Sequence, residues 1–492
     1  MKPLIRSLVL ACLPVALASC NVAVPGLAGA PGQTSVPGQA GAPGQAGVPG
    51  QAGAPGTASA SNKLSQYNNA SFADVVVGAD KTIHVIYGDK KKLNDSLGVY
   101  YRSSKDGGAS WSEPEILTAG DPIGREAGYM RLIQDGQGTI FALWKALTKD
   151  NVTADTASSS NAGSLVYRTL AGGGWGKLQS IGKADNTFAW FASVDPAGQL
   201  HLVWNEGSKY PISAGGPLAN SGKAEVFEAP VSAGTVGQAT LLITGQAAAG
   251  GAAPKNDVYD SLRGFVDAAG HTHFVAQKSP KEDPYKPILV YWNDGHEQNL
   301  GSLDSVTEKN NLFRNSPPVL LPDAQGQDHM IYWDQRADHP QVQDRLMDGK
   351  AAPVVIYQTK EAGGKVLNFE AYPGPGSTMV ALVGAKDLKD PQAAAEMFLA
   401  RSTASGWAAP TMLTNNNQAG TFMRVDTERR VGSNISQNVE YIPLYAAAGY
   451  DAAGSPHVVM INDAKTITSG YSYAGGTLGF TSAAPNVYYL KP

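Results

Sequence analysis

The sequence predicts an all-β protein, a β-propeller of seven blades, and two interleaved repeats carry this prediction. Short strands of β-branched and aromatic residues recur about every 65 residues. A turn followed by a histidine alternates with them along the chain. A fixed period of this kind, with Gly and Asp at the turns, is typical of radial β architectures. Six blades are the alternative, if the weak unit at 378–416 is an elaborated loop.

The first repeat marks one strand of each blade, which we assign to the third position. β-branched and aromatic side chains favour the half-buried surface of a pleated sheet. The seven copies lie at 99–102, 166–168, 226–228, 290–292, 355–357, 397–400 and 487–489.

The second repeat, Asp-x-x-Gly and then His, is predicted to join the innermost strand to the second strand. Asp bonds to the backbone that follows it, and Gly accepts a positive φ. Four copies, at 195–198, 267–270, 323–326 and 451–454, precede His201, His273, His329 and His457. Degenerate copies lie at 135–138 and 78–81, and a sixth unit keeps only the strand 378–383. We expect these histidines to bond turns or pack blades, because one per blade leaves them too far apart for a shared metal ion.

Residues 104–111 carry a motif of known shape. Ser104, Asp106, Gly108 and Trp111 match every defined position of Ser-x-Asp-x-Gly-x-x-Trp, and weaker echoes lie at 172–175 and 405–407. The chain therefore resembles the sialidase-like superfamily of Asp-box (BNR-repeat) propellers over residues 61–492. In that family the box is a structural hairpin on the face opposite the active site, which implies a structural role for these four residues.

The N-terminus predicts export and lipidation. Basic residues, an apolar run and small residues follow one another in residues 1–19, as in a signal peptide. Leu-Ala-Ser-Cys, ending at Cys20, resembles a bacterial lipobox, so we expect cleavage before Cys20 and lipidation of its thiol. An ordinary signal peptide with a free cysteine is the alternative. The lipid would attach the protein to a membrane at the bacterial cell envelope or surface.

Residues 20–60 form a Gly/Pro/Gln/Ala-rich, collagen-like tether. Gly stands at every third position from Gly26 to Gly56, interrupted only by Ser35. Such a segment predicts a disordered or extended Gly-X-Y stalk, with a reach of about 90 Å for thirty residues in a polyproline-like conformation. A monomer is favoured, and a homotrimer through the stalk is the alternative.

Charge and composition exclude one class of partner. The net charge of −4 falls to −6 once Lys2 and Arg6 leave with the signal peptide, and no run of Lys or Arg occurs. Nucleic-acid binding needs a basic surface, so no nucleic-acid partner is expected. No cofactor and no metal ligand set is predicted, and the sequence leaves open a structural calcium ion in the channel.

The ring is expected to close through its two ends. The last strand, 487–489, is of the third type, and no residues follow to make an outer strand. Residues 62–70 are predicted to supply that strand, which would cover an exposed sheet edge.

The candidate site lies where charged residues repeat at equivalent positions near one mouth of the channel. Charges at such positions need solvent or partners, so they are expected to converge on a pocket. The charged residues lie four positions before an Asp-x-x-Gly turn or five positions after the histidine that follows it. The catalytic candidates are Arg131, Arg263, Tyr445, Glu206 and Asp74, and the ligand-binding candidates are Tyr129, Asp89 and Asp334.

The resemblance implies roles for these residues. Sialidases bind the substrate carboxylate with an arginine triad, here Arg131 and Arg263, and use a tyrosine nucleophile, here Tyr445 or Tyr129. Asp74, Glu206 and Asp334 are candidates for acid or base. The family's Phe/Tyr-Arg-Ile-Pro motif is absent and a third arginine is unassigned. In the alternative interpretation the two arginines form salt bridges to Asp74 or to loop acids inside the channel.

Three functions follow from these patterns. The first is a surface lipoprotein whose propeller binds a glycan or another envelope ligand, helped by long second-to-third loops at 205–223, 334–353 and 463–486. The second is an exo-sialidase or related glycoside hydrolase. The third is a scaffold within an envelope protein assembly.

Overall fold

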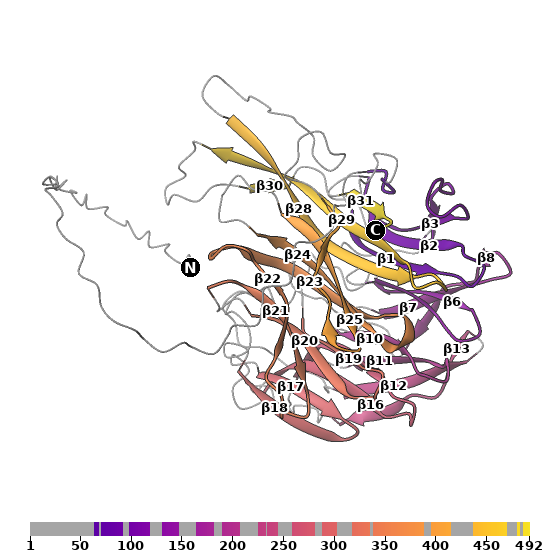
Figure 1. Cartoon of the computed structure of the whole chain (residues 1–492). Helices are drawn as coiled ribbons and strands as arrows, with labels where there is room; N and C mark the ends of the chain where they lie inside the picture. The colour runs from indigo at the N-terminus through magenta and orange to yellow at the C-terminus, as the bar shows by residue number, and fades with distance from the viewer. Residues whose placement is uncertain are drawn as a thin grey trace, which may run out of the picture. The chain divides into compact units, whose positions relative to one another are not determined.

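The protein is a seven-bladed β-propeller in a computed structural model, and Figure 1 shows the order of its strands. The chain divides into two units, Met1–Pro49 and Gly50–Pro492. The structure describes residues 63–67, 70–91, 98–118, 130–146, 164–181, 189–206, 225–232, 234–244, 258–280, 288–302, 317–334, 338–387, 395–414, 436–469, 480–482 and 486–492. The predicted signal peptide, Cys20 and the tether therefore lie outside the described residues. Within the described ranges no helix is long and apolar enough to cross a bilayer.

Each blade is one antiparallel sheet. Blade 1 contains β1 (Ser71–Val77), β2 (Ile83–Asp89), β3 (Gly98–Ser104) and β4 (Glu115–Ile116). Blade 2 contains β5 (Met130–Gln134), β6 (Ile140–Ala146), β7 (Ser164–Ala171), β8 (Gly174–Trp175) and β9 (Gln179–Ile181). Blade 3 contains β10 (Trp190–Val194), β11 (Leu200–Glu206), β12 (Glu225–Ser232), β13 (Thr235–Val236) and β14 (Thr240–Ile243). Blades 4 and 5 contain β15 (Val258–Val266), β16 (Thr272–Ser279), β17 (Ile288–Asn293), β18 (His296–Ser302); and β19 (Val319–Pro322), β20 (Asp328–Asp334), β21 (Gln341–Leu346), β22 (Val354–Gln358). Blades 6 and 7 contain β23 (Lys365–Pro373), β24 (Met379–Lys386), β25 (Glu396–Thr403), β26 (Gly406–Trp407), β27 (Thr411–Met412); and β28 (Ser436–Tyr450), β29 (Pro456–Ser469), β30 (Phe480–Ser482), β31 (Asn486–Leu490).

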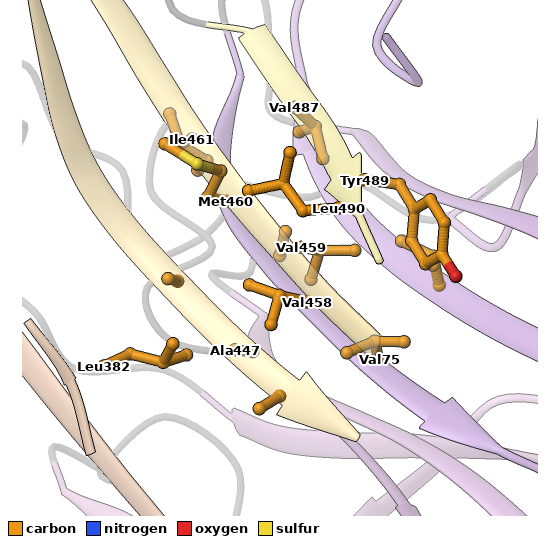
Figure 2. Close-up of a cluster of buried hydrophobic side chains, with 14 of the residues drawn as sticks. Val75, Leu382, Ala447, Val458, Val459, Met460, Ile461, Val487, Tyr489 and Leu490 are labelled. Atoms are coloured by element: carbon orange, nitrogen blue, oxygen red, sulfur yellow. The ribbon is translucent and has the colours of Figure 1, made fainter. Parts of the chain in front are cut away.

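The innermost strands β1, β5, β10, β15, β19, β23 and β28 each pack against the next, and β28 packs against β1, which closes the ring. Apolar side chains fill the spaces between neighbouring blades. Figure 2 shows one such cluster, which combines side chains of blade 7, such as Ala447 and Val458, with Val75 of blade 1 and Leu382 of blade 6. Burial of these interblade faces supplies the main favourable term for the fold.

The predicted turns join innermost and second strands, and they define what we call the turn face. In blade 3, the Asp195 carboxylate accepts a hydrogen bond from the backbone N–H of Gln199 at 2.8 Å. Gly198 has a φ of 85°, as the predicted turn requires. The opposite face, where second strands end and innermost strands begin, is the mouth face.

The Asp box also has the predicted form, in the turn between β3 and β4. The Ser104 hydroxyl donates to Asp106 and accepts the backbone N–H of Gly108, each at 2.8 Å. A Cβ atom on Gly108 would lie 2.2 Å from the Tyr489 ring of blade 7. The Trp111 ring meets the same tyrosine edge-on, with 5.1 Å between ring centroids. The box therefore joins two blades as well as shaping one hairpin.

The turn-face histidines bond to acids or tyrosines, as expected for structural groups. His84 and His457 lie 2.7 Å and 2.6 Å from the hydroxyls of Tyr101 and Tyr489, respectively. In blades 3 to 5 the partners are carboxylates: Glu228 for His201, Asp328 for His273 and Asp344 for His329. Three of these partners also contact a tryptophan from the next blade's outer turn: Tyr489 with Trp111, Tyr101 with Trp175 and Asp344 with Trp407.

Two strand assignments from sequence are wrong. Residues 355–357, predicted to form the third strand of blade 5, lie in its fourth strand, β22. The third strand is the polar β21, which lies within the predicted loop at 334–353. Residues 463–469 continue β29 and pair with β28, although they were assigned to a loop. A polar strand such as β21 lacks the apolar signal on which the assignment relied, and its buried Asp344 is a partner of His329.

The ring closes as predicted, through a segment that we call the closing segment, residues 63–67. Lys63 bridges Tyr488, and the Leu64 N–H donates to the Val487 carbonyl at 2.8 Å. The Ser65 hydroxyl donates to Asn486 at 3.0 Å. The N-terminal part of the propeller thus supplies the outer strand of blade 7.

Candidate functional site

Each of the seven innermost strands has one residue at an equivalent position. Its pairing partner on the second strand lies two residues after the histidine, or after the residue that stands in its place. These seven residues are Asp74, Arg131, Phe191, Arg263, Val319, Glu370 and Ala447. Four of them are charged. The spacing from the Asp-x-x-Gly turns predicts three of the four but not Glu370, because the blade 6 turn, Gly374–Thr378, contains no aspartate.

The first pair joins blades 1 and 2. Arg131 Nε lies 2.9 Å from Asp74 Oδ2, and the Asp74 side chain is almost fully buried. The same carboxylate accepts the backbone N–H groups of Val75 and Leu132, at 2.9 Å and 2.8 Å. Asp74 therefore ties the innermost strand of blade 1 to that of blade 2, and its carboxylate already has three donors.

The second pair crosses the channel. The Arg263 guanidinium on β15 bonds directly to the Glu370 carboxylate on β23, so it joins blade 4 to blade 6. Both side chains are 5% exposed. A buried charge is tolerated only beside a compensating charge, so each of these residues depends on the other.

Tyr372 links the two pairs. Its ring lies 5.0 Å from the Arg131 guanidinium carbon, a cation–π distance that joins blade 2 to blade 6. Its hydroxyl donates to the Ala446 carbonyl of blade 7 at 3.0 Å. We call Asp74, Arg131, Arg263, Glu370 and Tyr372 the channel cluster.

Burial dominates the electrostatics of the channel cluster. It raises the pKa of Asp74, against the opposing effects of Arg131 and of the two backbone donors. It also raises the pKa of Glu370, against the charges of Arg263 and Arg131. With two arginines and two acids the formal charge of the cluster is zero.

Backbone strain lies just before two of these charged residues. Phe72 and Ser261, each two positions earlier, have φ values of 52° and 56°. Both lie at irregularities in the pairing with the second strand, between Ser71 and Ala73 and between Asp260 and Arg263. A β-bulge redirects the residues that follow it, so these bulges help to aim Asp74 and Arg263.

The acids at the ends of the second strands have local partners. Asp89 Oδ2 accepts the backbone N–H groups of Gln66 and Tyr67, at 3.0 Å and 2.9 Å, so this carboxylate holds the closing segment. Glu206 accepts the indole N–H of Trp204 at 2.8 Å. Asp334 ends β20 and is half-buried. The contacts of Asp89 and Glu206 therefore lie with the closing segment and within blade 3, respectively.

Blade 4 holds a further polar group near the mouth face. Lys278, near the end of the second strand β16, lies 2.6 Å from Glu297, and the Tyr259 hydroxyl donates to the same carboxylate at 2.5 Å. Burial and this hydrogen bond to Glu297 raise the pKa of Tyr259.

The remaining candidates are the two tyrosines. Tyr129 lies outside the described residues. The backbone of Tyr445 pairs with Ile461 in blade 7, next to an irregularity at Pro443, and its side chain lies outside the described part of the chain. Among described residues, no group of three or more His, Cys, Asp or Glu side chains is arranged to hold a metal ion.

The fold and the Asp box define the chain as a seven-bladed propeller with a charge-balanced channel. No protein-family model and no curated protein sequence matches the chain. Among solved structures it is similar to an alpha-L-arabinanase of Penicillium chrysogenum, with 11% identity over 66% of this chain and 90% of that chain and a TM-score of 0.41. It is also similar to the NanB sialidase of Streptococcus pneumoniae, with 10% identity over 87% and 69% and a TM-score of 0.37. A Dyadobacter fermentans protein of unknown function has 10% identity over 86% and 95%, with a TM-score of 0.39. We carry no residue role over from these proteins.

Proposed function

We propose that the protein is a binding module, which captures a glycan or another envelope ligand at its mouth face and does not hydrolyse it. One observation carries the proposal: the two candidate arginines are already matched by buried acids of their own chain, Asp74 and Glu370. A substrate carboxylate would have to displace these acids. Breaking a buried pair leaves an uncompensated charge, which costs several kcal/mol, about 3 to 5 for pairs of this kind.

A glycan is the ligand class that the Asp-box resemblance favours. The rigid ring presents the ends of its second strands on the mouth face, and loops on a rigid scaffold often carry binding. The arabinanase and the sialidase are named for action on glycans, which is compatible with this class. An exo-sialidase activity would instead require Arg131 or Arg263 to exchange partners during turnover.

Two assays on purified residues 61–492 separate the functions. We expect no hydrolysis of a fluorogenic sialoside or of a panel of aryl glycosides, and specific binding on a glycan array. Sialoside turnover that is lost in Arg131→Gln and kept in Arg401→Gln would overturn the proposal. Arg401 of blade 6 is a matched control because it lies over the ring of Tyr450 of blade 7, outside the channel cluster. Absence of glycan binding, with a partner protein that co-purifies in high salt, would favour the scaffold function.

We also propose that Cys20 carries a lipid that anchors the protein at the cell envelope. The order of basic, apolar and small residues before Cys20 supports this. In the native bacterium, labelled fatty acid should enter the wild-type protein and not Cys20→Ala. Equal labelling of both would contradict lipidation at this residue.

A further inference from the structure

The contact between blades 7 and 1, which we call the seam, rests on a buried histidine. His457 Nδ1 lies 2.6 Å from the Tyr489 hydroxyl, and this hydroxyl also donates to the Gly107 carbonyl of the Asp box at 3.3 Å. Trp111 then packs against the tyrosine ring. A chain of contacts thus leads from an imidazole in blade 7 to the outer hairpin of blade 1.

The other side of blade 1 repeats this arrangement. His84 lies 2.7 Å from the Tyr101 hydroxyl, and the Tyr101 ring meets Trp175 of blade 2 edge-on at 5.1 Å. Blade 1 therefore has a tyrosine-bonded histidine at each of its two interfaces, with blade 7 and with blade 2. A phenol carries no charge at neutral pH, so it offers a protonated imidazole no counter-charge.

The charges that face these two histidines are few. His457 has Asp451 at 3.7 Å from its Nε2, and Lys491, which follows β31, opposes a positive charge there. Among the described residues, Asp80 of its own turn is the charge that acts on His84. The histidines of blades 3 to 5 each have a carboxylate within 2.9 Å and a second at 3.3 to 3.5 Å.

These environments shift the pKa values in opposite directions. Burial lowers the pKa of His84 and of His457, where Lys491 adds to the effect, and the turn aspartates oppose it only in part. Burial acts in the same sense on His201, His273 and His329, but their carboxylate partners outweigh it and raise each pKa.

We propose that the seam is an acid-sensitive latch, which loosens when the tyrosine-bonded His457 must take up a proton while blades 3 to 5 hold. A histidine whose folded-state pKa is lowered costs stability as pH falls below the unfolded value of about 6.5. One whose folded-state pKa is raised contributes stability that is fully present below that value and is lost as pH rises through the folded pKa. Acid therefore weakens the seam and strengthens the far side of the ring.

Hydrogen exchange of the intact protein tests the latch. Amide exchange, corrected for its intrinsic pH dependence, is compared at about pH 7.5 and about pH 5. We expect the opening equilibrium of the closing segment and β31 to rise as pH falls, by at most about thirtyfold per histidine, the limit that an unfolded-state pKa of about 6.5 sets between these two pH values. Peptides from β20 and β21 should keep or gain protection. Unchanged protection at the seam, or equal loss in both regions, would overturn the proposal.

A pair of variants assigns the effect to the seam. His457→Asn keeps a side-chain amide near the Nδ1 position and does not titrate, so it should reduce the acid response of β31. His329→Asn, in blade 5, should leave that response unchanged. If both variants respond to acid as the wild type does, the latch is not His457 and the proposal fails. If His457→Asn does not fold, the wild-type comparison between β31 and β20 still decides.

Discussion

Contacts across the channel and contacts on the turn face hold the ring together in different ways. In the channel, Arg263 of blade 4 bonds to Glu370 of blade 6, so the pair joins blades that are not neighbours. On the turn face, the tryptophan of one outer hairpin contacts the preceding blade in its ring order, as Trp407 does with Asp344. Contacts of the first kind involve arginine side chains in the channel, whereas contacts of the second kind recur around the ring. Neighbour contacts build the ring, and channel contacts join blades that are not neighbours.

The largest effect is expected from breaking the cross-channel pair. Glu370→Gln keeps the shape of the side chain but leaves Arg263 buried without a counter-charge, so the free energy of unfolding should fall by about 3 to 5 kcal/mol. Denaturant unfolding measures the loss, and Glu113→Gln, at an exposed glutamate, is the control with a change of at most about 0.5 kcal/mol. A change in Glu370→Gln as small as in the control would mean that the channel pair is not required for stability.

The next effect concerns the closing segment. Leu64 is fully buried, and Leu64→Ala should cost about 2 to 5 kcal/mol through lost burial and the cavity left behind. Leu241→Ala, at a position that is 42% exposed, is the matched control. Deletion of residues 61–72 should lower the melting temperature still further. A melting temperature unaffected by that deletion would show that the ring does not depend on its closing segment.

A smaller effect tests the turn-face contacts. Trp407→Phe removes the indole N–H that donates to the buried Asp344 at 2.9 Å, so we expect a loss of about 1.5 to 3 kcal/mol. Trp175→Phe keeps an aromatic edge against Tyr101 and should cost less. If the two variants lose equal stability, ring packing rather than the hydrogen bond dominates these contacts.

The Asp box itself should give a still smaller effect. Ser104→Ala removes the hydroxyl that joins Asp106 to Gly108, with an expected cost of about 0.5 to 1.5 kcal/mol. Thermal unfolding of this variant beside Ser110→Ala, at the exposed end of the same hairpin, measures it. A larger loss in Ser110→Ala would place the main support of the hairpin at its exposed end.

The smallest effect is a pH dependence of that hairpin. Hydrogen bonds from the Ser110 side chain and backbone, and then from Ser104, lower the pKa of Asp106 to about 2. Its stabilising contribution is therefore present above the unfolded value of about 3.8 and is lost as pH falls towards 2. NMR titration of the Asp106 carboxyl group checks the shift, and a midpoint near 3.8 would contradict it.

The repeated parts of this fold and the closure of the ring could be predicted from sequence, and the pairing across the channel could not. Turn residues such as Asp195 and Gly198 act within four residues of one another, so their pattern predicts their structure. The salt bridge between Asp74 and Arg131 joins adjacent copies of the repeat, and the sequence predicted such a bridge as the alternative to substrate binding. The pairing of Arg263 with Glu370 depends on how blades 4 and 6 meet across the channel, which no local pattern records.

Two candidates show the same limit at the mouth face. Asp89 was predicted to bind a ligand, yet the structure shows its carboxylate bonded to the backbone of the closing segment. Glu206 has the indole N–H of Trp204 as a partner, only two residues away. The repeat predicted the strand positions of these two acids correctly. The hydrogen bonds that their carboxylates accept depend on tertiary structure, which the repeat does not predict.

The closing segment also has a consequence for the order of folding. The bond between Ser65 and Asn486 spans 421 positions of the chain, so blade 7 cannot be completed until nearly all of the propeller has been synthesised. Contacts between such distant residues form slowly, and the unclosed ring exposes strand edges and apolar surface in the meantime. Closure is therefore expected to be the last step of folding, and a chain released before residue 486 can present six blades and no finished ring.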